Sequence, residues 1–212
     1  IHPEKIIEEF SKILSFHTND LDELPTVELK DNDTRTILTD RKIAKEIYLY
    51  DLKLIDYRAY RSKPTVKTKQ VILSGTPANM ETKNSDDVLA TWKIIDIPYI
   101  DYIKKSVRIF GRENFKKALS RFEIILDSYP NDVNANFYSG LCLFNFGEYK
   151  NAIESFSKCI DSPFTNFDEE SRWMIAMCHE NDGNHTVSKK LFKQITYAKG
   201  YYASQARDKL NQ

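Results

Sequence analysis

The chain has 212 residues, of which 41% are hydrophobic and 12% aromatic, so it has enough apolar mass for one large domain or two small ones and is unlike a disordered chain. Its 31 basic residues balance 31 acidic residues. This balance gives no long-range attraction to nucleic acid, and we predict no nucleic-acid partner. The low content of breakers, 6 Gly and 7 Pro, favours long helices over an all-β fold.

Short apolar runs interrupted by charges predict no membrane span within this chain. The chain begins at Ile1 and not at Met, which indicates a processed or shortened chain. The three cysteines, Cys142, Cys159 and Cys178, lie inside apolar helical patterns and form no CxxC pair. We therefore predict that they are buried core residues, and not disulfides or zinc ligands.

Residues 1–97 contain no repeat and predict a small α+β module. We expect a helix over residues 6–14, followed by a β-hairpin from residues 26–30 and 36–39. A second helix should run from Asp40 to about Tyr57. A strand over residues 65–73, a loop over 76–86 and a helix near 88–92 should follow. The second helix is predicted from the spacing of Ile43, Ile47, Tyr50 and Leu54.

The second half of the chain contains an internal repeat. Three segments that begin near Gly111, Gly147 and Gly183 each carry a small residue followed, four positions later, by Phe. The small residues are Ala118, Ala152 and Ser188, and the aromatic residues are Phe122, Phe156 and Phe192. Both series are separated by 34 and then 36 residues.

A period of 34 residues with these residue types resembles the tetratricopeptide repeat family. The resemblance extends to a small residue in each first helix, at Ser106, Gly140 and Ala176, and to Pro130 at the end of the first unit. In the second unit Pro163 comes one position early and a two-residue insertion follows. The third unit has no closing proline.

The resemblance implies a stack of three helical hairpins with a capping helix at the end. The expected helices span residues 99–110, 114–127, 134–146, 149–159, 170–181 and 186–196, and the cap spans 201–210. The predicted fold class is mostly α, with residues 98–212 as the repeat domain and residues 1–97 as the small α+β module.

The chain contains no recognised catalytic motif. GxxxxGK, GxGxxG, HExxH and GxSxG are all absent from the sequence. Cys178, His179 and His185 lie near one predicted turn, but no fourth ligand follows at a recognised spacing, so we predict no metal site. We therefore predict a protein that is not an enzyme and has no cofactor.

Proteins of this repeat family usually bind protein or peptide on the concave face formed by the first helices. A well-known version uses Lys, Asn and Arg to clamp the carboxylate tail of chaperones. The matching positions here are Ile103, Val107, Tyr138, Glu170 and Met174. Without clamp residues, a chaperone-tail co-factor is not expected.

The predicted concave face is instead apolar, which suits an amphipathic helix or an apolar peptide. The candidate groove residues are Ile103, Val107, Phe110, Phe137, Leu141, Phe144, Trp173 and Met177. An open stripe of this size would invite aggregation, so its cover is a partner, a second subunit or the chain's own N-terminal segment.

These observations leave two function classes. The first is a protein-binding scaffold that uses the apolar groove. The second is a small-ligand receptor or enzyme with its site in residues 1–97. The third repeat, with Trp173 to Cys178 followed by Gly183, also resembles repeats common in bacterial cell-envelope proteins. This resemblance favours the cell envelope or periplasm, while the cytoplasm stays an alternative.

Overall fold

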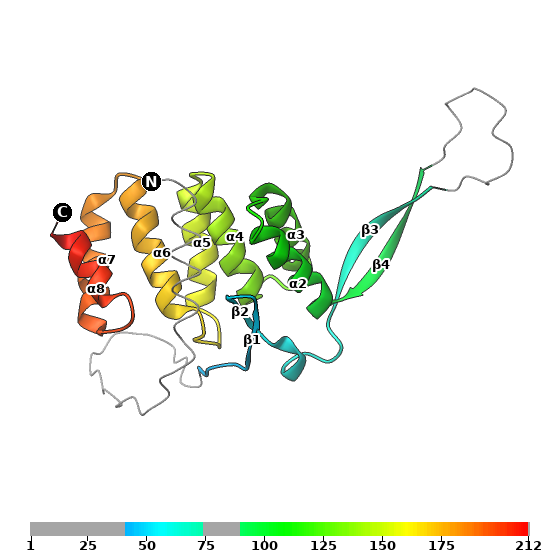
Figure 1. The fold of residues 1–212 in the computed structure, drawn as a ribbon, viewed down its shortest axis with the longest axis horizontal. Coiled ribbons are helices and arrows are strands. Elements are labelled where there is room, and N and C mark those ends of the chain that lie inside the picture. The colour runs from blue at the N-terminus through cyan, green and yellow to red at the C-terminus, as the bar shows by residue number, and fades with distance from the viewer. Residues whose placement is uncertain (1–40, 74–89, 212) are drawn as a thin grey trace, which may run out of the picture.

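The computed structural model describes residues 41–73 and 90–211. Within these residues, two small antiparallel sheets precede seven helices that stack side by side (Figure 1). The strands are β1 (Glu46–Leu49), β2 (Leu52–Ile55), β3 (Thr65–Leu73) and β4 (Ala90–Pro98). The helices are α2 (Tyr99–Phe110), α3 (Phe115–Ser128), α4 (Val133–Asn145), α5 (Tyr149–Ile160), α6 (Asp168–Asn181), α7 (His185–Ala198) and α8 (Ala203–Leu210). The short 3-10 helix η2 (Tyr57–Ala59) follows β2.

The six repeat helices pair as predicted: α2 with α3, α4 with α5, and α6 with α7. The small residues sit where the two helices of each hairpin approach. A Cβ atom added at Gly140 would lie 2.7 Å from the ring of Phe156. Phe156 is fully buried and also meets Phe137, with ring centroids 5.7 Å apart. The predicted fold class is therefore confirmed, and the three cysteines are free and buried as expected.

The turns inside the hairpins correct one detail of the repeat alignment. Gly147 and Gly183 adopt the left-handed conformation, with φ of 77° and 79°, directly before the second helix begins. In the first repeat this place is taken by Glu113, with φ of 61°. Gly111 lies two residues earlier, in the right-handed region, as the residue that ends α2. Gly111 is therefore not the structural counterpart of the other two glycines.

The predicted capping helix is present as α8, which begins at Ala203. Tyr202 and Ala206 are buried against the third repeat. The ring of Tyr202 is stacked on that of Trp173, with centroids 5.2 Å apart and an interplanar angle of 11°. This contact closes the apolar end of the stack, as a capping element must.

The predicted helix from Asp40 to Tyr57 is wrong, because residues 46–55 within it form the β1–β2 hairpin. The apolar spacing suggested a helical face, yet Ile43 and Tyr50 are each 75% exposed. The strands are joined by the two-residue turn Tyr50-Asp51, in which Tyr50 has φ of 55°. Two-residue hairpin turns usually carry Gly or Asn where φ is positive, so this turn gave no sequence signal.

The predicted helix near residues 88–92 is also wrong, because β4 begins at Ala90 and continues to Pro98. The predicted strand over residues 65–73 is confirmed as β3, and it pairs with β4 over nine residues. Pairing across the sheet therefore outweighed local helix preference. The elements expected within residues 6–14, 26–39 and 76–86 lie outside the described residues, and the domain division at residue 97 stays a prediction.

Replacement of Phe156 by Ala is expected to lower the free energy of unfolding by about 3–5 kcal/mol, because the ring fills the space beside Gly140. For a chain of this size the melting temperature should fall by roughly 6–20 °C. Lys158→Ala, an exposed change on the same helix, is the control and should change stability by less than about 0.5 kcal/mol. A Phe156→Ala melt within a degree or two of the wild type would contradict the observed helix packing.

Candidate functional site

The eight predicted groove residues lie on the first helices of the three repeats, α2, α4 and α6. Six of them are buried, and Trp173 and Met177 are half-buried. The buried residues are Ile103, Val107, Phe110, Phe137, Leu141 and Phe144. Three of these have no exposed surface, so in this conformation no partner touches them. The structure does not test their role in partner binding, which stays a prediction.

Repeat residues cover part of this set, since Phe137 meets Phe156 and Phe167, and Phe144 meets Tyr149. Residues 41–61 also lie against the first helices, mainly at other positions of α4 and α6. In Figure 1 the β1–β2 hairpin lies beside α4 and α2, near the middle of the stack. Leu54 and Ile55 are fully buried in the same core cluster as the repeat helices. Leu52 reaches the end of α2, where its Cδ1 atom lies 3.6 Å from the Cβ position of Gly111. Part of the N-terminal half therefore packs against the first helices of the repeats.

Asn134, near the start of α4, binds the backbone of this segment at two points. Its amide oxygen accepts from the backbone N–H of Ile55 at 2.7 Å, and its amide nitrogen donates to the carbonyl of Ile55 at 2.9 Å. The same nitrogen donates to the hydroxyl of Tyr99 at 3.1 Å. Since Asn134 is fully buried, each of these bonds replaces one that water would supply.

A buried ion pair joins β2 to α6. The ammonium of Lys53 donates to the carboxylate of Glu170 and to the backbone carbonyl of Asn166, and both charged side chains are only 5% exposed. The ammonium also lies 4.7 Å from the centroid of the Phe167 ring. The hydroxyl of Tyr138 donates to the backbone carbonyl of Lys53 at 2.7 Å. A charge so fully removed from water is tolerated only when it is paired in this way.

The loop between α5 and α6, which contains the two-residue insertion, holds residues 41–46. Arg41 makes a bidentate pair with Asp168 at 2.6 and 2.7 Å. Lys42 forms a parallel β-bridge with Phe164. Asn166 holds the backbone of Ala44 as Asn134 holds that of Ile55: it accepts from the N–H at 2.8 Å and donates to the carbonyl at 3.0 Å. The loop that contains the insertion therefore provides the binding site for residues 41–46.

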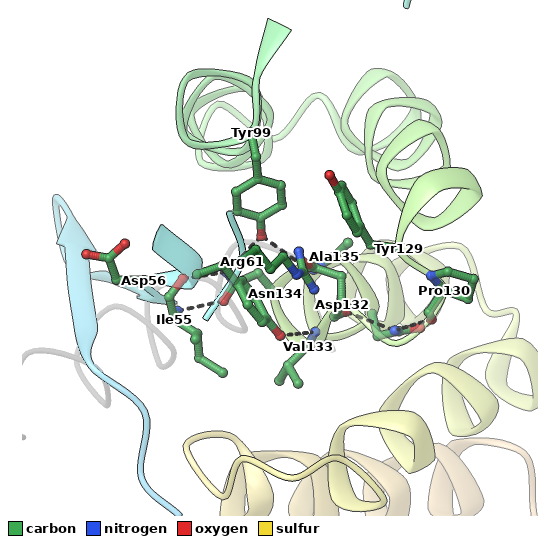
Figure 2. A network of polar contacts seen from close by, with 12 residues as sticks. Ile55, Asp56, Arg61, Tyr99, Tyr129, Pro130, Asp132, Val133, Asn134 and Ala135 are labelled. Carbon is green, nitrogen blue, oxygen red and sulfur yellow. Dashed lines mark hydrogen bonds and ion pairs between the residues drawn. The ribbon is translucent and has the colours of Figure 1, made fainter. Parts of the chain in front are cut away.

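A third network fixes the point where residues 41–61 leave the groove (Figure 2). Arg61 donates to the buried carboxylate of Asp132 at 2.7 Å. Its guanidinium carbon lies 3.7 Å from the ring centroid of Tyr57, 4.3 Å from that of Tyr129 and 5.4 Å from that of Tyr99. Such a cation between aromatic faces is bound by charge and by stacking together.

Asp132 also caps α4, because its carboxylate accepts from the backbone N–H of Ala135 at 2.8 Å. It accepts a further bond from the hydroxyl of Tyr99 at 3.1 Å. Burial raises the pKa of this carboxyl above its ordinary value, while Arg61 and the hydrogen bonds act in the opposite direction. The arrangement ties the first turn of α4 to the N-terminal segment.

The first helices and the α5–α6 loop therefore hold an extended segment of the same chain by its backbone. Tyr138 and Glu170, which occupy clamp positions of the repeat family, bind the chain's own Lys53. The roles of Asn134 and Asn166 could not be predicted from the sequence, because a single buried amide leaves no sequence pattern. The insertion after Pro163 was visible in the sequence, and it was the one sequence signal for the loop that binds residues 41–46.

The comparisons with known proteins agree with this geometry. Residues 134–163 match a family model described as tetratricopeptide repeat, which covers α4, α5 and the loop after α5. The tetratricopeptide resemblance is supported at the middle repeat. The search of curated proteins found no match. A repeat of this kind indicates a protein-interaction scaffold, and such repeats are typically non-catalytic.

No helix within residues 41–73 and 90–211 is long and apolar enough to cross a membrane. Across the same ranges, no three His, Cys, Asp or Glu side chains are grouped to hold a metal ion.

The Lys53–Glu170 pair generates a stability prediction. Glu170→Gln leaves the Lys53 ammonium buried without a counter-charge, so we expect a loss of about 3–5 kcal/mol in urea denaturation. The double variant Lys53→Met/Glu170→Gln removes both charges and should regain most of that loss. Glu154→Gln, at an exposed position on α5, is the control. A Glu170→Gln protein as stable as the wild type would mean that the pair does not hold the segment.

The Arg61–Asp132 contact generates a pH prediction. Arg61→Ala removes a charge that lowers the pKa of Asp132, so this already raised pKa rises further above 3.8. The folded state then retains a proton that the unfolded chain releases, and stability falls as pH rises. The loss should be smaller near pH 4 and grow to about 3 kcal/mol near pH 7.

Arg61→Lys is the matched control, because it keeps the charge and loses the planar stacking on the three tyrosines. Its stability loss should depend much less on pH. Urea denaturation at both pH values measures the difference, and an Arg61→Ala loss equal at both values would refute the linkage to Asp132.

Proposed function

We propose that the protein is a non-catalytic protein-interaction scaffold whose concave groove binds extended chain, with residues 41–61 as its resident ligand. The observation that supports this most strongly is the pair of asparagines. Asn134 and Asn166 each bond both the N–H and the carbonyl of one residue of the segment. A surface that binds an extended peptide needs side chains that hydrogen-bond the peptide backbone at several positions along its length.

The proposed partner site is the part of the groove that the resident segment leaves accessible. Trp173 and Met177 on α6 are half-buried, whereas the groove residues of α2 are buried. A partner helix or extended peptide would therefore lie along α6 beside the resident segment, with Met177 as its apolar anchor, because the Trp173 ring already packs on Phe192 and Tyr202.

The alternative function, a ligand receptor or enzyme with its site in the N-terminal half, receives less support. A cavity of about 410 Å³ lies between α5, α6 and α7 and is therefore lined by repeat residues. The buried polar groups of residues 41–61 are used in bonds to the repeats, so they are not available to a substrate in this conformation. These observations favour the scaffold.

The test is site-specific photo-crosslinking of the full chain in its native host. A photoreactive phenylalanine analogue placed at Met177 should capture discrete protein partners. The same analogue at Lys158, an exposed position on α5, is the matched control and should capture few. Equal capture at both positions, or no capture at Met177, would refute partner binding along α6.

A further inference from the structure

The β3–β4 ribbon projects away from the helix stack (Figure 1). Only its base is held by the body. Val66, near the start of β3, is fully buried. The hydroxyl of Tyr129 accepts from the backbone N–H of Thr65 at 3.2 Å and donates to its carbonyl at 2.9 Å. The backbone N–H of Tyr99 donates to the carbonyl of Pro64 at 2.8 Å. The ribbon therefore leaves the body at a fixed position.

The two faces of the ribbon differ in what they contact. Residues paired across the strands share a face. One face carries Val66 and its partner Ile97, and Ile97 packs against the core cluster. The other face carries Trp92 and Ile94, which are 67% and 65% exposed. These two side chains contribute little to the packing of the body.

The outward face is chemically asymmetric. Along β4 it is apolar, at Trp92 and Ile94. Along β3 it is basic, because Lys69 is paired with Ile94, and Lys67 with Asp96. The two β3 lysines, Lys67 and Lys69, disfavour the addition of another strand at the β3 edge, whereas β4 carries the single lysine Lys93. Within residues 41–73 and 90–211, neither strand has a second neighbour, so the β4 edge offers unpaired backbone groups beside exposed apolar side chains.

We propose that the β4 edge receives an extended segment of another protein, in which apolar and acidic residues alternate. Added as a third strand, such a segment would place its apolar side chains beside Trp92 and Ile94 on the outward face. Its acidic side chains would fall on the opposite face, next to Lys93. This goes beyond the groove, because the ribbon and α6 use different residues.

Charge also decides against a second copy of the chain as the occupant. Two β4 strands paired edge to edge would bring Lys93 of each copy onto the same face. Like charges placed across neighbouring strands are destabilising. On the face where the acidic side chains would lie, Lys93 is the charged residue among those described, so an acidic partner is complementary there.

The test uses the full chain labelled with 5-fluorotryptophan, which reports on both tryptophans in one fluorine NMR spectrum. The probe is a blocked nine-residue peptide in which Val alternates with Glu, and the matched peptide has Lys in place of Glu. The Val/Glu peptide should shift the Trp92 resonance and leave that of Trp173 unchanged. The Val/Lys peptide should bind about tenfold more weakly.

Two variants make the test specific. Lys93→Glu should reverse the preference between the two peptides. Ile94→Ser should abolish the Trp92 shift, whereas Tyr197→Ser, at an 82% exposed position on α7, should not. Neither ribbon variant should move the thermal melt, because both positions lie outside the core.

Each opposing outcome would overturn the proposal. No Trp92 shift by the Val/Glu peptide up to about 1 mM would exclude strand addition of useful affinity. A Trp92 shift that depends on protein concentration alone would assign the edge to a second copy. A shift with phosphatidylglycerol vesicles and with neither peptide would assign the face to a membrane surface.

Discussion

The rest of the structure depends on the need to pair polar groups that have been removed from water along the concave face. Asp132, Asn134 and Glu170 lie on or next to the first helices, and all are buried. An unpaired carboxylate or amide at such a place is costly. Partners for all three come from residues 41–61, so the groove and this segment cannot be separated without exposing both sets.

This requirement explains why a helical repeat and a β-hairpin form one body. A repeat normally buries its open apolar face against the next repeat. Here the first helices also present a face that β2 covers with Leu54 and Ile55. The buried ion pair between Lys53 and Glu170 fixes where β2 lies along α6. It adds little net stability, because the attraction between the charges only offsets the cost of removing them from water. The amide bonds of Asn134 set the same register at the backbone.

The contacts that hold residues 41–61 also position the β3–β4 ribbon. Arg61 is held by Asp132 and three tyrosines just before β3 begins, so anchoring the segment also orients the ribbon. We propose two separate surfaces for partners on this body. One runs along α6 beside the resident segment, and the other is the β4 edge of the ribbon with Trp92 and Ile94.

Sequence by itself determined the helical repeats, because their contacts are local and periodic. Gly140 and Phe156 meet across one hairpin, so their spacing of 16 residues recurs in the neighbouring units and identifies the repeat. It also identified β3, by its partial alternation and a turn signal. The apolar character of the first-helix residues was visible, but what covers them was not.

Only the tertiary structure decided that residues 46–55 form a hairpin, that residues 90–98 form β4, and that residues 41–61 pack on the first helices. Ile43 and Tyr50 carry helical spacing, yet long-range bonds of residues 41–61 to α4 and α6 selected strands. These contacts join residues separated by 76 to 127 positions. No local pattern encodes such a pairing, because a buried Asn or Lys is favourable only when its distant partner is in place.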